Sequence, residues 1–173
     1  MALFDSKARQ FEIHFSRYKN LIYDYAIAVL NDRETAGDIL QETFIKLYEQ
    51  MNRNSNIKDV KSWLFITARN LCFNHKRNNR SNIPLGAIHN DIPDGKSPDD
   101  ERLYILAKAM WEIEDKYREA LILKEYQALS YAEIATILQT SVSSVKSLLF
   151  RARVSLREKF NHLVKEGEKH DMR

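Results

Sequence analysis

The residues that interrupt helices are few in this chain and lie mostly in one segment. The 173 residues include only four glycines and three prolines. All three prolines and two of the glycines fall between Ser81 and Pro98, a polar stretch without helical periodicity. The sequences on either side are strongly periodic, which predicts an all-α protein of two small helical domains. The segment between them predicts a flexible interdomain linker; a structured active-site loop is the alternative.

Composition excludes several classes of function. The apolar content of 44% is enough for a packed core in each half. No segment has the apolar length of a signal peptide or a membrane span, and the single cysteine, Cys72, cannot form an intramolecular disulfide, so we expect a cytoplasmic protein. Metal-ligand spacing, a glycine-rich phosphate loop and a nucleophile–base pair are missing from the sequence. We therefore expect a non-enzymatic protein without a cofactor.

Three helices are predicted in the first half. The first extends from about Lys7 to Leu30, with apolar residues at alternating spacings of four and three. Asp32 is the candidate N-cap of the second, which extends to about Met51. The third spans about 60–80. The predicted core stripes are Phe11, Phe15, Tyr18, Ile22, Tyr25 and Val29 in the first helix, Ala36, Leu40, Phe44, Leu47 and Met51 in the second, and Val60, Leu64, Thr67 and Leu71 in the third.

The second predicted helix has a polar face with an isoleucine at its centre. At about 100° per residue, this face lies almost opposite the core stripe. An apolar centre with a polar rim is typical of a protein-docking site, and a single exposed isoleucine on a solvated helix is the alternative. The candidate docking residues are Asp38, Gln41, Glu42, Ile45 and Glu49.

Aromatic and basic side chains share the other side of the third helix. The segment 61–80 contains five lysines or arginines and no acidic residue. Aromatic rings can stack on unpaired bases and cations can hold phosphates, so this face suits DNA whose strands are separated. The alternative places Phe65 and Phe73 in the core and the arginines in solvent. The residues of this face are Phe65, Ile66, Arg69, Phe73, Lys76, Arg77 and Arg80.

The segment from Ser130 to Phe160 predicts two short helices joined by a tight turn. Each helix has one apolar stripe, so the two can close on each other. The remaining face of the second helix is polar and basic, as in a helix-turn-helix protein that reads the major groove; an ordinary amphipathic hairpin is the alternative. The stripes are Tyr131, Ile134, Ala135 and Leu138, then Val145, Leu149, Ala152 and Leu156. The candidate DNA contacts are Ser143, Ser144, Lys146, Ser147, Arg151 and Arg153.

Three motifs follow one another in register along the chain. They are DILQETFIKLYE in the second helix, WLFITARNLCFNHKR in the third, and YREALILKEYQALSYAEIATILQTSVSSVKSLLFRAR in the second half. Together they resemble the extracytoplasmic-function (ECF) sigma factors, bacterial initiation factors that join core RNA polymerase and select promoters. The resemblance implies a core-binding and minus-ten domain at 1–80, a linker at 81–100, a minus-thirty-five helix-turn-helix domain at 101–165 and a tail at 166–173.

The resemblance also implies a role for each face. The polar face of the second helix matches positions that dock on the clamp helices of the polymerase's largest subunit, and the polymerase flap is a further expected contact. The third helix and the loop before it match the part that opens the minus-ten element and holds a flipped base, by binding rather than ATP hydrolysis. An anti-sigma factor or another recruiting protein is the remaining expected partner. The implied minus-ten contacts are Arg53, Asn54, Asn56, Lys58, Phe65, Arg69, Asn70, Phe73, Asn74, Lys76, Arg77 and Arg80.

The chain departs from the family pattern at three positions. Gln139 replaces the glycine usual in the turn, which predicts a different turn backbone. Leu148 stands where many members carry an arginine, which predicts weaker upstream-element contacts and dependence on a recruiting partner or on promoter shape. Gly37 replaces a common acidic residue next to Asp38 and leaves the docking face less charged.

Two other classes of function fit parts of the sequence. A stand-alone helix-turn-helix regulator would bind two-fold symmetric duplex sites without polymerase. A protein that only sequesters another factor would tolerate changes between Ser143 and Arg151. Neither alternative accounts for both the acidic face of the second helix and the aromatic-basic face of the third.

Overall fold

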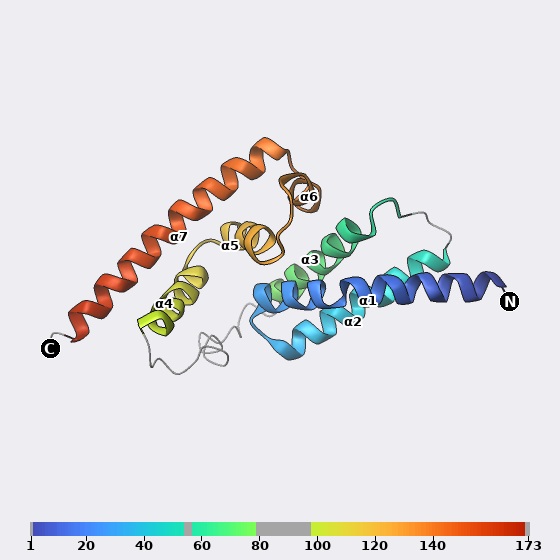
Figure 1. Cartoon of the computed structure of the whole chain (residues 1–173), viewed down its shortest axis with the longest axis horizontal. Helices are drawn as coiled ribbons and strands as arrows, with labels where there is room; N and C mark the ends of the chain where they lie inside the picture. Colours follow the sequence, from blue (N-terminus) through green and yellow to red (C-terminus); the bar gives the residue numbers. More distant parts are fainter. Residues whose placement is uncertain (1, 54–56, 79–97, 172–173) are drawn as a thin grey trace. The chain divides into compact units, whose positions relative to one another are not determined.

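The computed structural model describes residues 2–53, 57–78 and 98–171, with side chains described for 7–53, 57–78 and 99–167. These residues form helices joined by short connections, and no strand occurs among them (Figure 1), which confirms the all-α class. The helices are α1 (Ala2–Leu30), α2 (Arg33–Asn52), α3 (Val60–Asn78), α4 (Pro98–Glu112), α5 (Asp115–Leu121), the π-helical segment η2 (Ile122–Tyr126), α6 (Tyr131–Ile137) and α7 (Val142–Asp171). The chain divides into two compact units, one built on α1, α2 and α3, the other on α4, α5 and α7.

The connection between α1 and α2 is a tight turn. Asn31 adopts a left-handed conformation with φ of 54°, and its N–H donates to the carbonyl of Ile27 at 2.7 Å. The predicted N-cap is confirmed, because the Asp32 carboxylate accepts the Glu34 N–H at 3.1 Å and the hydroxyl of Thr35. The Thr35 hydrogen bond is the main cause that lowers the pKa of Asp32. Since the chain reverses here, α1 and α2 lie side by side in Figure 1.

The core of the first unit lies between α1, α2 and α3, each of which packs against the other two. The predicted α1 stripe is buried only in its second half; its first three residues are half-buried. In α2 the stripe is buried except at its half-buried Leu40 and Met51, and Ile39 and Thr43 are buried as well. The buried residues of the α1 and α2 stripes are Ile22, Tyr25, Val29, Ala36, Phe44 and Leu47.

The predicted core stripe of α3 is wrong by about one residue, or about 100° of helix rotation. Of the predicted stripe only Leu64 is buried, whereas Phe65 and Cys72 are fully buried. Phe65 packs edge-on against Tyr25 with ring centroids 5.5 Å apart. Both sides of α3 are apolar at helical spacing, so contact with the α1 core decides which one is buried.

The helix α4 begins at Pro98, two residues before the end of the predicted linker at residue 100. Proline suits the first helical turn, and Asp99, Asp100 and Glu101 place negative charge at the N-terminus of α4, where the helix dipole favours it. Residues 79–97, which hold the rest of the predicted linker, lie outside the described part of the chain.

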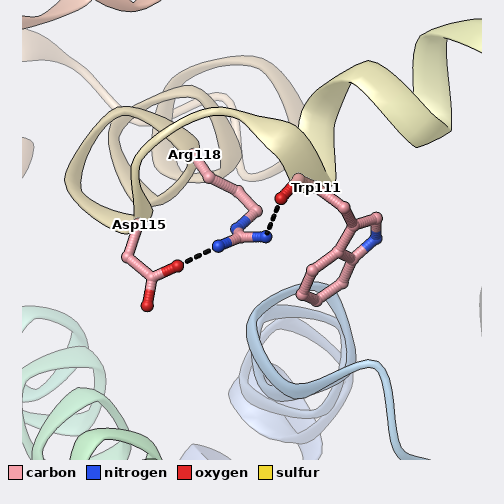
Figure 2. Close-up of polar contacts among 3 residues, drawn as sticks. All are labelled: Trp111, Asp115 and Arg118. Carbon is pink, nitrogen blue, oxygen red and sulfur yellow. Dashed lines mark hydrogen bonds and ion pairs between the residues drawn. The ribbon is translucent and has the colours of Figure 1, made fainter. Parts of the chain in front are cut away.

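A buried arginine joins α4 to α5 (Figure 2). Arg118 is 7% exposed, and its guanidinium donates to the carbonyl of Trp111 at 3.2 Å and to the carboxylate of Asp115. The same guanidinium lies 4.2 Å from the centroid of the Trp111 ring. Burial lowers the pKa of Arg118, and the Asp115 carboxylate opposes that shift. One side chain therefore holds both sides of the α4–α5 corner.

The predicted helix pair is present as α6 and the N-terminal part of α7. Ser130 and Glu133 form a capping box, in which the Ser130 N–H donates to the Glu133 carboxylate at 2.8 Å and the Glu133 N–H donates to the Ser130 hydroxyl at 3.2 Å. In the turn after α6, Gln139 has a φ of 53°, the left-handed region that glycine adopts without strain. Glutamine therefore adopts here a conformation that glycine would adopt without strain, and a turn backbone different from that of the family stays a prediction.

The last helix is longer than predicted. α7 has 30 residues and continues through most of the predicted tail, to Asp171. Both α4 and α5 pack against it. No helix in the described ranges combines the length and the apolar character needed to cross a membrane.

Candidate functional site

The predicted docking residues of α2 all lie on its exposed face. The buried residues of α2 occupy the opposite side, so the helical period leaves this face to solvent. Ile45 is 50% exposed at its centre. Two salt bridges cross its rim, from Lys46 to Glu42 at 3.3 Å and from Arg53 to Glu49 at 3.9 Å. The exposed face consists of Asp38, Gln41, Glu42, Ile45 and Glu49.

An apolar groove that the sequence did not reveal lies beside this face. It has a volume of about 370 Å³ and lies between α1 and α2. Phe11 and Phe15 were predicted as core residues, but they are half-buried and line the groove. Phe11 meets Tyr48 edge-on, with centroids 5.5 Å apart. The groove is lined by Ala8, Phe11, Phe15, Gln41, Phe44, Ile45 and Tyr48, so Gln41 and Ile45 belong to both surfaces.

The aromatic-basic face of α3 is smaller than predicted. Phe65 is buried, so it is not a surface residue available to DNA. Phe73 is half-buried, and the Arg69 guanidinium lies 4.8 Å from its ring centroid. The Arg77 guanidinium donates to the Asn74 side-chain oxygen at 3.2 Å. Arg69 is therefore held over the Phe73 ring, and Arg77 is exposed near the C-terminal end of α3.

The remaining predicted minus-ten residues are distributed around α3. Asn70 is exposed and Lys76 is half-buried on α3, and Lys58 is exposed just before it. Arg53 is exposed at the end of α2, where it pairs with Glu49 rather than with the α3 face. Asn54, Asn56 and Arg80 lie outside the described residues.

All predicted minus-thirty-five residues are exposed on α7. Val145, Leu149 and Ala152 are buried and fix the orientation of the helix. The Ser141 hydroxyl accepts the N–H of Ser144 at 3.1 Å, which caps the start of α7. The exposed residues are Ser143, Ser144, Lys146, Ser147, Arg151 and Arg153.

The sequence reading missed an aromatic residue on this face. Phe150 is 68% exposed, and Val154 one turn later is 39% exposed. At about 100° per residue, Val154 projects between Ser143 and Ser147, and Phe150 projects about 20° beyond Ser143, both on the side away from the buried stripe. A helical wheel built on that stripe could have identified them, because large apolar residues are unexpected on a solvated face.

Within the described ranges, no group of three histidine, cysteine or carboxylate side chains is arranged to hold a metal ion. The candidate sites are instead exposed helix faces: an acidic and apolar face on α2, a cation–aromatic face on α3, and a polar, basic and aromatic face on α7.

Comparison with known proteins defines the class. The family model for Sigma-70 region 2 matches residues 14–82, and the model for Sigma-70, region 4 matches residues 104–156. The two matched segments contain α2 and α3, then α5, α6 and the first half of α7. The chain is therefore built from the two helical regions of the sigma-70 class.

Individual relatives narrow the class further. The ECF RNA polymerase sigma factor SigM of Bacillus subtilis strain 168 is 31% identical over 157 residues, which cover 88% of this chain and 96% of SigM. The RNA polymerase sigma-H factor of Pseudomonas aeruginosa is 27% identical over 174 residues, covering 92% of this chain and 90% of that protein. This chain belongs to the ECF RNA polymerase sigma factors.

Solved structures agree on the fold. The sigma factor RpoE of Bartonella quintana, crystallised with the anti-sigma factor NepR, superposes with a TM-score of 0.70 at 22% identity. The match covers 88% of this chain and 98% of RpoE. Two helical domains in this order are thus common to both proteins.

Proposed function

We propose that this chain binds core RNA polymerase in the cytoplasm, recognises promoter DNA and promotes strand opening, without catalysing a reaction itself. The observation that carries the proposal is the match to SigM over almost its whole length, with both sigma-70 regions in order. The alternative of a stand-alone regulator has no comparable support, because it leaves the faces of α2 and α3 without a role.

The α2 face is the proposed site for the clamp helices of the largest polymerase subunit. Ile45 supplies an apolar centre, and Asp38, Gln41, Glu42 and Glu49 supply a polar rim. Such a composition is typical of a protein interface. The adjoining α1–α2 groove extends the apolar area that a partner helix could cover.

The α3 face is the proposed site for the opened minus-ten strand. A flipped base costs a few kcal/mol of unstacking, so it must be captured by stacking and by phosphate contacts. Arg69 stacked on Phe73 offers a flat cationic surface, and Arg77 and Lys76 offer charge. Asn70 and Asn74 add amide groups for base edges.

The exposed face of α7 is the proposed reader of the minus-thirty-five element. Serine hydroxyls can hydrogen-bond to donor or acceptor groups on the base edges, and Arg151 can donate to guanine. Phe150 is suited to contact with a thymine methyl group. Leu148 is half-buried, so it offers less to DNA than a long cationic side chain would.

A groove between α4 and α7 is the proposed site for the polymerase flap. Its volume is about 610 Å³, and its apolar lining is Leu103, Leu106, Leu156 and Phe160. Leu103 is 56% exposed and Leu106 is 39% exposed, which leaves apolar surface free for a partner. An anti-sigma factor is proposed as a competing partner, since RpoE was solved with one.

The proposal is tested by the assembly of the full chain with bacterial core RNA polymerase on a sizing column. The chain should comigrate with core enzyme, and Gln41→Ala should weaken the complex. Failure of the chain to join a competent core would instead favour the stand-alone regulator.

Two further variants separate the proposed steps. Glu42→Ala should reduce polymerase binding more than promoter opening, and Arg77→Ala should do the reverse. Opening is measured by permanganate reactivity of unpaired thymines on a promoter that the wild-type holoenzyme opens. Equal effects of both variants on both steps would contradict the division of roles between α2 and α3.

A further inference from the structure

The two arginines among the predicted minus-thirty-five contacts, Arg151 and Arg153, differ in what they contact. The Arg153 guanidinium donates to the Glu125 carboxylate at 2.7 Å, across 28 residues of sequence. In the described part of the chain, Arg151 forms no ion pair. Glu125 belongs to η2, so the segment before α6 brings a negative charge to the edge of the reading helix.

The same place gathers further cations around one aromatic ring. The Lys124 ammonium lies 5.0 Å from the Tyr131 ring centroid, and the Lys146 ammonium lies 6.0 Å from it. Lys124 also donates to the Leu129 carbonyl at 3.0 Å, which fixes its position. With Arg153, these side chains give three positive charges and a single carboxylate. The excess of positive charge suits a phosphate group.

Arg153 is held by its neighbours but remains accessible. The hydrogen bond that Arg153 donates to the Glu125 carboxylate is the main cause that raises the pKa of Arg153, and Tyr131 contributes less. The Arg153 side chain is 48% exposed and the Glu125 side chain is 51% exposed. An ion pair at this exposure favours the closed Arg153–Glu125 contact by at most about five-fold in its equilibrium constant, so a DNA phosphate can replace the carboxylate.

We propose that Glu125 competes with DNA for Arg153. Its carboxylate binds the Arg153 guanidinium where a phosphate of the DNA backbone would bind, and so lowers the affinity of α7 for duplex DNA. Carboxylate and phosphate both accept the forked N–H groups of arginine, so one exchanges for the other without rearrangement of the helix. The inference rests on the proposed reading role of α7. It adds a residue outside the helix-turn-helix that sets how tightly that helix binds.

The test compares full-length variants on a 25-base-pair duplex of mixed sequence, by fluorescence anisotropy over a series of salt concentrations. Glu125→Gln should bind about two- to five-fold tighter than wild type, with a salt dependence steeper by about one counterion. The matched control is Glu158→Gln, which removes the same charge from an exposed position further along α7. Its affinity should rise by clearly less than that of Glu125→Gln.

A double-mutant cycle with Arg153→Gln isolates the competition. If Glu125 acts by holding Arg153, the gain from Glu125→Gln should disappear in the Arg153→Gln background. An equal gain in both backgrounds, no gain at all, or an equal gain in the Glu158 control would each overturn the inference. Glu125→Gln should comigrate with core polymerase as the wild type does. If the wild type itself failed to comigrate, the proposed function would be refuted, whatever the result for Glu125.

Discussion

The buried Arg118 at the α4–α5 corner offers a quantitative test of what holds the second unit together. Arg118→Ala removes the bond to the Trp111 carbonyl, the contact with the indole ring and the buried stem of the side chain. An orphaned carbonyl costs about 1–3 kcal/mol, and a partly buried cation–π contact about 1 kcal/mol. The lost stem adds a packing term. We expect Arg118→Ala to lower the free energy of unfolding by about 3 kcal/mol, and Arg118→Met by about 2 kcal/mol because the stem is kept.

The ion pair itself should contribute little. The Asp115 side chain is 54% exposed, so water solvates it when the arginine is absent. Asp115→Asn should therefore cost less than about 1 kcal/mol. Urea unfolding is followed by the fluorescence of Trp111 in a Trp63→Phe background, since these are the two tryptophans of the chain. If Asp115→Asn destabilised the protein as much as Arg118→Ala, the charge pair rather than the carbonyl and the ring would hold the corner, and the reasoning would be refuted.

Three further predictions concern a turn, a cap and the reading face. Gln139→Gly should raise the free energy of unfolding by about 0.5–1 kcal/mol, because glycine removes left-handed strain; Asn31→Gly is the control and should change urea stability little. Asp32→Ala should cost about 1 kcal/mol at pH 7. The folded-state pKa of Asp32 lies below the ordinary aspartate value of 3.8, so this contribution is present above that value and lost as pH falls through the folded-state pKa. The deficit of the Ala variant should therefore shrink in acid. A deficit that stays constant down to acid unfolding would contradict the role of the charged cap. Phe150→Ala should weaken promoter binding by holoenzyme by about three- to ten-fold while leaving thermal unfolding unchanged, because the ring is 68% exposed; an unchanged promoter affinity would remove Phe150 from the reading face.

The helices themselves could be predicted from the sequence, because period and capping are local properties. Asp32 as an N-cap needs only the residues that follow it, and the exposed serines of α7 follow from its buried stripe. The burial of Phe65 could not be predicted in the same way. α3 carries apolar residues on two sides, and the side that packs against Tyr25 of α1 is the one that is buried. The resemblance to sigma factors implied a role for each face, but it did not indicate which side chains on the faces already contact other residues of the chain.

Contacts between distant residues were beyond the reach of the sequence. The Arg153–Glu125 pair joins η2 to α7, and the Phe11–Tyr48 contact forms the groove between α1 and α2. Each depends on how separate elements pack, which no periodicity encodes. Phe150 is a different case, because its position opposite Val145 and Ala152 follows from helix geometry alone.

The continuity of α7 has a mechanical consequence. Its 30 residues form one rod of about 45 Å, with the serines proposed to contact bases near one end and the groove residues Leu156 and Phe160 further along. If these serines contact bases as proposed, a protein bound in that groove would set the angle at which the N-terminal end of α7 enters the major groove. A partner of this groove would then change promoter preference without any change in a base-contacting residue.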